Sequence, residues 1–181
     1  MSASLTLCQK CVRRLACFGL AALVGLGHGV SAASDLDQFA TADGRLRQQL
    51  RMLDVQHGYV GETGTAWVIE PTGDFSVSPL INQKVGQPRR EGKLTSDQLE
   101  SVVQVLADAN FADLPARLGR NVPTNARVIS VAFGDDQTSL SLPPRPSIEV
   151  DRLVAEGAAA SEIEADFLAI VETVQDLTAP D

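Results

Sequence analysis

The stretch from Gly92 to Pro115, G-K-L-T-S-D-Q-L-E-S-V-V-Q-V-L-A-D-A-N-F-A-D-L-P, predicts a helix with well-marked ends. Thr95 has the short hydroxyl of a helix N-cap, and Gln98 three residues later completes a capping box. Asn110 suits the left-handed conformation that ends many helices, and Pro115 prevents the helix from continuing. The apolar residues between these ends have the spacing of one buried face: Leu99, Val102, Val103 and Leu106. We therefore expect a core helix here.

Two β-hairpins are predicted on either side of this helix. Residues 65–70 and 75–78 alternate and are rich in β-formers, and the turn sequence P-T-G-D lies between them. We expect Trp67 and Ile69 to oppose Phe75 and Val77 in this first hairpin. The second is predicted from the strand sequence at 127–133, a turn at 134–137 and another strand at 138–142.

Further helices are expected near both ends. Leu46, Leu50 and Leu53 have helical spacing, which predicts a helix to about Gln56, with His57-Gly58 ending it and a loop at 58–64. Residues 34–44 are polar and are expected to be loosely ordered. Ser147 is placed to cap a short helix that ends at Gly157. A second capping box, Ser161 to Glu164, precedes an apolar stripe of Ile163, Phe167, Ile170, Val171 and Val174.

These elements predict an α+β fold. Amphipathic helices must bury their apolar stripes, and antiparallel hairpins with one apolar face supply the surface. We expect a two-layer domain in the order ββαββα, with the helices packed on one face of the sheet. The domain is expected to span residues 65–178, and residues 34–64 to form an N-terminal helix and loop.

Residues 1–33 have the three regions of a secretory signal peptide. Lys10, Arg13 and Arg14 precede an apolar run, and small residues ending in Ala32-Ala33 follow it. All three cysteines, Cys8, Cys11 and Cys17, lie in this segment, and the C-x-x-C spacing within it has no second ligand pair. We therefore expect a secreted or periplasmic protein, cut after Ala32 or Ala33, whose mature chain has no thiol.

The net charge limits the classes of partner that the protein is expected to bind. The net charge of −8 becomes −11 in a chain that starts at Ser34, because residues 1–33 carry three cationic side chains and no acidic one. An acidic chain is a poor match for nucleic acid or anionic membrane, and we expect no stable membrane insertion after cleavage. The connection at 79–93 is locally basic. Its candidate partner-contact residues are Lys84, Arg89, Arg90 and Lys93; a solvated loop is the alternative interpretation.

Few residues are available for catalysis. His57 is the one histidine after residue 33, no cysteine remains, and no G-x-S-x-G, phosphate-binding loop or dinucleotide fingerprint occurs. One histidine and no cysteine are too few ligands for a zinc site of histidines and thiolates. Asp135-Asp136 is more typical of a turn than of a calcium-binding site. Glu162 and Asp166 leave a glycosidase-type pair open. We expect no catalytic residue, no metal and no cofactor.

The order of elements and several fold-determining residues resemble small domains of exported bacterial proteins of unknown function. They are also similar to the emfourin-like domains, which are inhibitors of protealysin-type metalloproteases. The matching positions are Gly92, Leu94, Thr95, Gln98, Leu99, Leu106, Phe111, Leu114, Pro115 and the hairpin at 128–142. The Trp67 strand and the long connection before Gly92 depart from that pattern. The resemblance implies the fold, and protease inhibition as one activity, without assigning binding residues.

The sequence thus favours an exported, non-catalytic module that binds an unidentified protein, with protease inhibition as one form of that activity. The contact surface is expected at 79–93 and in the irregular segment 116–126. The alternative is a structural or accessory protein of the cell envelope, whose partners use the acidic helical faces. A hydrolase built on His57 is the third hypothesis.

Overall fold

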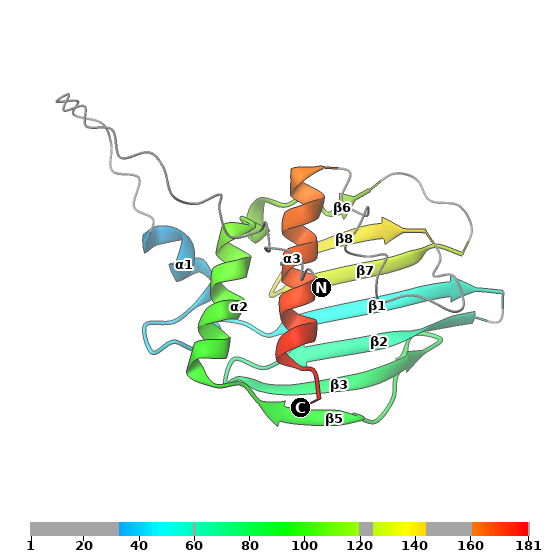
Figure 1. Cartoon of the computed structure of the whole chain (residues 1–181), viewed down its shortest axis with the longest axis horizontal. Helices are drawn as coiled ribbons and strands as arrows, with labels where there is room; N and C mark the ends of the chain where they lie inside the picture. The colour runs from blue at the N-terminus through cyan, green and yellow to red at the C-terminus, as the bar shows by residue number, and fades with distance from the viewer. Residues whose placement is uncertain (1–32, 60, 120–124, 144–160, 181) are drawn as a thin grey trace, which may run out of the picture. The chain divides into compact units, whose positions relative to one another are not determined.

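The computed structural model describes residues 33–59, 61–119, 125–143 and 161–180, which belong to one compact unit. They form an eight-stranded, mostly antiparallel sheet and three α-helices (Figure 1). The predicted α+β class is confirmed. The predicted signal peptide, apart from Ala33, and the predicted helix at 147–157 lie outside the described residues.

The elements follow one another along the chain as α1 (Ala33–Phe39), β1 (Leu50–Gly58), β2 (Gly61–Ile69), β3 (Asp74–Ile81), β4 (Lys84–Val85), β5 (Arg90–Lys93), α2 (Ser96–Asp108), the 3-10 turn η1 (Phe111–Asp113), β6 (Arg117–Leu118), β7 (Arg127–Phe133), β8 (Asp136–Leu142) and α3 (Glu162–Leu177). The strands lie in the order β4-β3-β2-β1-β7-β8-β6, and β5 pairs with β3 beside β4. The β6–β8 pair is parallel, and the other pairs are antiparallel.

The predicted order ββαββα and the predicted helix at 46–56 are wrong. Residues 50–58 form β1, a central strand that pairs with β2 on one side and β7 on the other. The helical spacing was misleading because both faces of this strand carry apolar side chains. Leu50 and Met52 enter the core on one face, while Leu53 and Val55 are half-buried on the other. The alternation of apolar and polar residues that marks a strand is lost when both faces of the strand are apolar.

The first hairpin is longer than predicted. The segment at 58–64, expected to be a loop, contains the turn between β1 and β2 and the start of β2. The register of β2 and β3 places Trp67 opposite Val77 and Ile69 opposite Phe75, which confirms that prediction. The second hairpin, β7 with β8, is also confirmed. Residues 34–64 therefore contain most of α1, the central strand β1 and the start of β2.

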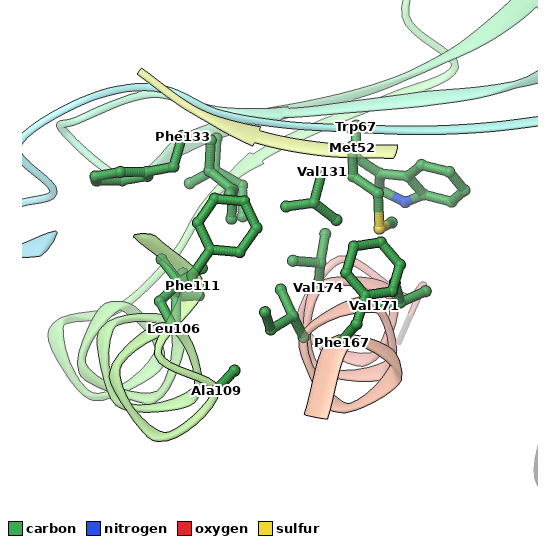
Figure 2. Close-up of a cluster of buried hydrophobic side chains, with 14 of the residues drawn as sticks. Met52, Trp67, Leu106, Ala109, Phe111, Val131, Phe133, Phe167, Val171 and Val174 are labelled. Carbon is green, nitrogen blue, oxygen red and sulfur yellow. The ribbon is translucent and has the colours of Figure 1, made fainter. Parts of the chain in front are cut away.

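Helices α2 and α3 cover the same face of the sheet, as Figure 1 shows. The predicted cap of α2 is confirmed, since the backbone N–H of Gln98 donates to Thr95 Oγ1 and the Gln98 side chain accepts from the Thr95 backbone. Asn110 has a positive φ of 46°. The four predicted core residues of α2 are buried. Between the layers, side chains of both helices meet Met52, Trp67 and Val131 of the sheet (Figure 2).

One position of the α3 stripe was predicted incorrectly. Ile163 is 45% exposed, whereas Phe167, Ile170, Val171 and Val174 are buried as expected. Leu168 takes part in the core instead. The predicted cap is present in part, because the Glu164 backbone N–H donates to Ser161 Oγ. In the same first turn Glu164 is buried instead, so the buried face of α3 begins at Glu164.

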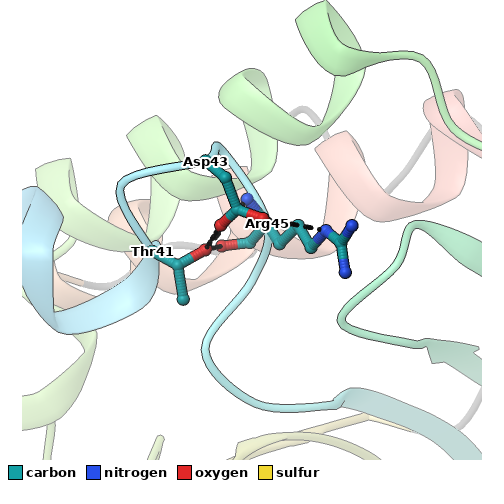
Figure 3. A network of polar contacts seen from close by, with 3 residues as sticks. All are labelled: Thr41, Asp43 and Arg45. Atoms are coloured by element: carbon teal, nitrogen blue, oxygen red, sulfur yellow. Dashed lines mark hydrogen bonds and ion pairs between the residues drawn. The ribbon is translucent and has the colours of Figure 1, made fainter.

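The segment at 34–44 is ordered, contrary to expectation. Phe39 of α1 packs edge-on against Phe133, with ring centroids 5.5 Å apart. The turn that follows is closed by a polar network in which Thr41 Oγ1 donates to the Asp43 carboxylate and Arg45 pairs with it at 3.0 Å (Figure 3). The Thr41 hydroxyl, and to a smaller extent Arg45, lower the pKa of Asp43. Within the described part of the chain, every helix is too short or too polar to cross a bilayer.

Candidate functional site

The four predicted contact residues lie along the sheet edge beside β3. Lys84 belongs to β4, Arg90 and Lys93 belong to β5, and Arg89 directly precedes β5. The segment at 79–93, which we expected to be a long connection, therefore contains the end of β3 and two short edge strands. The structure places the four cations in one segment but directs them to different surroundings.

Arg90 is engaged within the fold. It is paired in register with Val77, whose side chain is in the core, so the Arg90 side chain lies on the helix-covered face. Its guanidinium Nη1 donates to the carbonyl oxygen of Thr178, the C-cap of α3. Helix C-termini are favourable sites for cations, and α3 has no basic residue in its own last turn. Arg90 thus supplies the positive charge that the last turn of α3 lacks.

Lys93 is engaged as well, on the opposite face. Its Nζ lies 3.5 Å from Asp74 Oδ1 across the β3–β5 pair, and both side chains are exposed. The Thr72 hydroxyl donates to Asp74 Oδ2 at 2.6 Å. The Thr72 hydrogen bond is the largest cause that lowers the pKa of Asp74, and Lys93 adds to it. This is a local turn network at the start of β3.

Lys84 and Arg89 are different, because their side chains are exposed and form no ion pair or hydrogen bond with the described residues. The backbone between them is irregular, with the Gly86 N–H donating to Pro79 O and the Arg89 N–H donating to Val77 O. An interrupted edge that carries Pro88 and charged side chains discourages pairing with strands of other molecules. These two cations are available to a partner's side chains, but the edge itself is protected.

Three exposed apolar side chains lie at the same end of the sheet, where the register puts Ile81 on the helix-covered face and Val85 on the opposite face. Tyr59 is 95% exposed in the turn between β1 and β2, Ile81 at the end of β3 is 58% exposed, and Val85 of β4 is 52% exposed. Asn82 joins the two turns, since its N–H donates to Glu62 O at 2.8 Å and its Oδ1 accepts from the Glu62 N–H at 3.0 Å. We call Tyr59, Ile81 and Val85 the apolar corner.

A buried ion pair lies on the helix-covered face, toward the end where β1 meets its turn. Arg127 Nε donates to Asp54 Oδ1 at 2.7 Å and Nη2 donates to Oδ2 at 2.6 Å, and both residues are almost fully buried. Sequence reasoning missed this pair. The signal was available, because Asp54 alternates with Leu50 and Met52 and would share their face once β1 is taken as a strand.

His57 is placed away from that ion pair. Its Nδ1 lies 3.2 Å from Glu62 Oε1, and this half-exposed pair is on the face opposite Asp54, since positions 54 and 57 of a strand point to opposite sides. His57 and Asp54 therefore cannot act on one substrate. In the described ranges, no group of three or more His, Cys, Asp and Glu side chains is arranged to hold a metal ion.

The segment at 116–126, expected to be irregular, contributes β6 and a contact with β1. Gln56 Nε2 donates to Asn125 O at 2.6 Å, and the His57 N–H donates to Ala126 O at 3.0 Å. Residues 120–124 are outside the described part, so its predicted role in binding remains a prediction. The backbone contacts show that its C-terminal end is fixed to the central strand.

The sheet face opposite α2 and α3, which we call the open face, is made of three registered rows across β3, β2, β1, β7 and β8. The rows are Ser76-Val68-Arg51-Ala132-Gln137, Ser78-Ala66-Leu53-Ser130-Ser139 and Leu80-Gly64-Val55-Val128-Ser141. Arg51 is the sole charged residue in these rows, but the same face continues to Glu91 of β5, which is opposite Ser76, and to the His57–Glu62 pair beyond the third row. Most of the side chains in these rows are half-buried, whereas Ala66, Ser78 and Leu80 are buried, and neither α2 nor α3 covers this face.

Gly64 lies in the middle of the third row. A Cβ at this position would come within 2.1 Å of Asp54 O, so β1 and β2 approach too closely here for any side chain. The surface of the open face is consequently recessed at Gly64, between the side chains of Leu80 and Val55 in the same row.

No protein-family model matches this chain, and no curated protein sequence matches it. The resemblance to emfourin-like domains therefore stays an expectation from the sequence. The geometry itself offers two uncovered surfaces, the apolar corner with its neighbouring cations and the open face of the sheet.

Proposed function

We propose that this chain is an exported, non-catalytic module that binds another protein through the apolar corner. The observation that carries the proposal is the position of Tyr59, Ile81 and Val85 at one end of the sheet, since they account for three of the five large apolar side chains that are exposed in the described residues. Aromatic and aliphatic side chains gathered at one place are typical of contact surfaces, and tyrosine is enriched among residues that dominate binding energy.

The neighbouring charges define the chemistry of the partner. Lys84 and Arg89 belong to the same edge as the apolar corner and are free of internal ion pairs within the described residues. Arg90 and Lys93, by contrast, are held by Thr178 and Asp74. A segment that combines an apolar side chain with carboxylates would match this surface, since complementary charges speed association and exclude wrong partners.

The backbone of the corner supports such a role. The two turns that carry it are joined by the Asn82–Glu62 hydrogen bonds and continue directly into paired strands. A contact surface held by a sheet loses little conformational freedom when it binds, which favours affinity. Export is the other part of the proposal, and it rests on the leader-like composition of residues 1–33.

The proposal is tested by capture from envelope extract. The bait is the wild-type protein, a corner variant with Tyr59→Ala and Ile81→Ser, and a control with Ile163→Ser, which changes an exposed apolar residue on α3. We expect a partner that the wild type and the control retain and the corner variant loses. The captured partner is then titrated against Arg89→Glu, and weaker binding is expected.

Protease inhibition is assayed in parallel with thermolysin-like metalloproteases. Inhibition that the corner variant loses would make the partner a protease. Identical capture and identical inhibition by all three proteins would remove the apolar corner from consideration.

A further inference from the structure

We propose that the open face is the interface of a homodimer, in which two copies of this chain pack sheet against sheet. It uses a different surface from the apolar corner and does not depend on the proposed function.

The charges of the described residues are segregated between the two sides of the molecule. The outer surfaces of α2 and α3 carry exposed carboxylates and no lysine or arginine: Asp97, Glu100, Asp108, Glu162, Glu172 and Asp176. The centre of the open face, in contrast, has Arg51 as its one charge in three rows, and the other charged residues of this face lie at its rim: Glu62, Asp74, Glu91 and Lys93. Depletion of charged residues at the centre of a surface is the compositional mark of an interface.

This segregation points to a second copy as the occupant. The chain has a net charge of −8, so two copies repel each other when their helical sides approach. When the open faces meet, the sheets lie about 10 Å apart and the helices are behind them, so the carboxylates of the two copies are separated by well over the Debye length of about 8 Å. Two copies of this acidic chain therefore repel each other least when their open faces meet.

The face is large enough for a dimer. Five strands, β3, β2, β1, β7 and β8, at about 4.8 Å, and seven residues at about 3.3 Å along β7, give a footprint of about 550 Å². The accessible area of a surface formed by side chains exceeds its flat footprint. This is of the order of the roughly 800 Å² that each partner of a standard interface buries.

The side chains suit sheet-on-sheet packing. Leu53 lies at the middle of the central row, with Val55 and Val128 in the next row and serine or alanine around them. Small side chains allow close approach of two sheets, and Leu53 can enter the low position that Gly64 leaves on the partner. A contact in which the same surface is used by both copies closes with two-fold symmetry and does not propagate.

The test measures the oligomeric state of the full chain as it is purified, by sedimentation equilibrium and by melting at several protein concentrations. We expect a dimer at roughly 100 μM and a melting temperature that rises with concentration, because dissociation is linked to unfolding. Leu53→Glu and Val128→Glu each place like charges opposite one another, and we expect the dissociation constant to rise at least about a hundred-fold.

Two controls keep the outcome decisive. Gln104→Glu adds the same charge to the exposed surface of α2 and is expected to leave the dimer intact. Leu53→Ala removes the same side chain but adds no charge, and we expect it to weaken the dimer less than Leu53→Glu does. Such a difference would show that the added charge, and not misfolding, dissociates the dimer. A wild-type monomer at roughly 100 μM, or dimers that persist in both open-face glutamate variants, would overturn the proposal.

Discussion

Arg127 of β7 holds Asp54 of β1 through two parallel hydrogen bonds of 2.7 and 2.6 Å, on a face whose other side chains are apolar apart from Gln56. The two residues are diagonal neighbours on adjacent strands, because Arg127 is opposite Gln56 and Asp54 is opposite Ile129. Breaking a buried pair from one side leaves the other charge without its counterion. Replacing both partners removes the cost of burying them.

Asp54→Asn is therefore expected to destabilise the fold by about 3–5 kcal/mol, and Asp54→Leu together with Arg127→Met to restore stability to within about 1 kcal/mol of the wild type. Urea unfolding followed by circular dichroism gives both values. Asp74→Asn, at an exposed ion pair, serves as the control with a small effect. A double variant as unstable as the single one would show that the pair is needed for the packing around it.

Arg90 and Arg89 form a natural pair of adjacent arginines with different roles. Arg90→Ala removes the charged hydrogen bond to Thr178 O at the end of α3, and we expect a loss of about 1.5–3 kcal/mol. Arg89→Ala, at an exposed side chain, is expected to change the free energy of unfolding by less than about 0.5 kcal/mol. Thermal melts of the two variants check the difference. Equal melting temperatures would contradict the proposed helix-end role of Arg90.

The apolar stripe of α3 provides a test of the core. Phe167 is fully buried, and Phe167→Ala should cost about 3–5 kcal/mol because a cavity remains. Ile163 is on the same predicted stripe but is 45% exposed, so Ile163→Ala is expected to cost less than about 1 kcal/mol. Denaturant midpoints with unchanged slopes would attribute the difference to packing. Similar costs at both positions would place Ile163 in the core after all.

The turn before β3 gives a prediction about pH. The folded-state pKa of Asp74 is lowered from 3.8, so its contribution to stability is present above that value and is lost as the pH falls through the lower folded value. NMR titration of the carboxyl carbon should show a larger rise of this pKa in Thr72→Val than in Lys93→Met, because the Thr72 hydroxyl is the largest cause of the shift. The opposite ranking would assign the shift to Lys93.

Much of the fold could be predicted where local signals agree. The capping box at Thr95 and the alternation in residues 127–133 are strong in themselves, and the corresponding helix and strand are present. The strand at 50–58 could not be predicted in the same way. Leu53 and Val55 make its second face apolar, although that face lies outside the helix-covered core. Apolar residues on both faces give the sequence a spacing that resembles a helix, whereas the strand is paired on both sides in the sheet.

The surfaces were harder to predict than the elements. The basic segment was found from its composition, but composition does not show that Arg90 reaches the end of a helix many residues later in the chain. Tyr59 and Ile81 lie at the same end of the sheet, where Asn82 is hydrogen-bonded to Glu62, and this contact has no sequence signal of its own. Side chains that meet only through the sheet register become visible once the register is known.

The place of β1 also constrains the order in which the protein can be made. Its neighbour β2 follows it directly, but its other neighbour, β7, is synthesised only after β3 and the whole of α2. Until β7 emerges, one hydrogen-bonding edge of an apolar strand stays open, and pairings between distant segments form slowly. A nascent chain therefore cannot complete its sheet until most of its length has been synthesised.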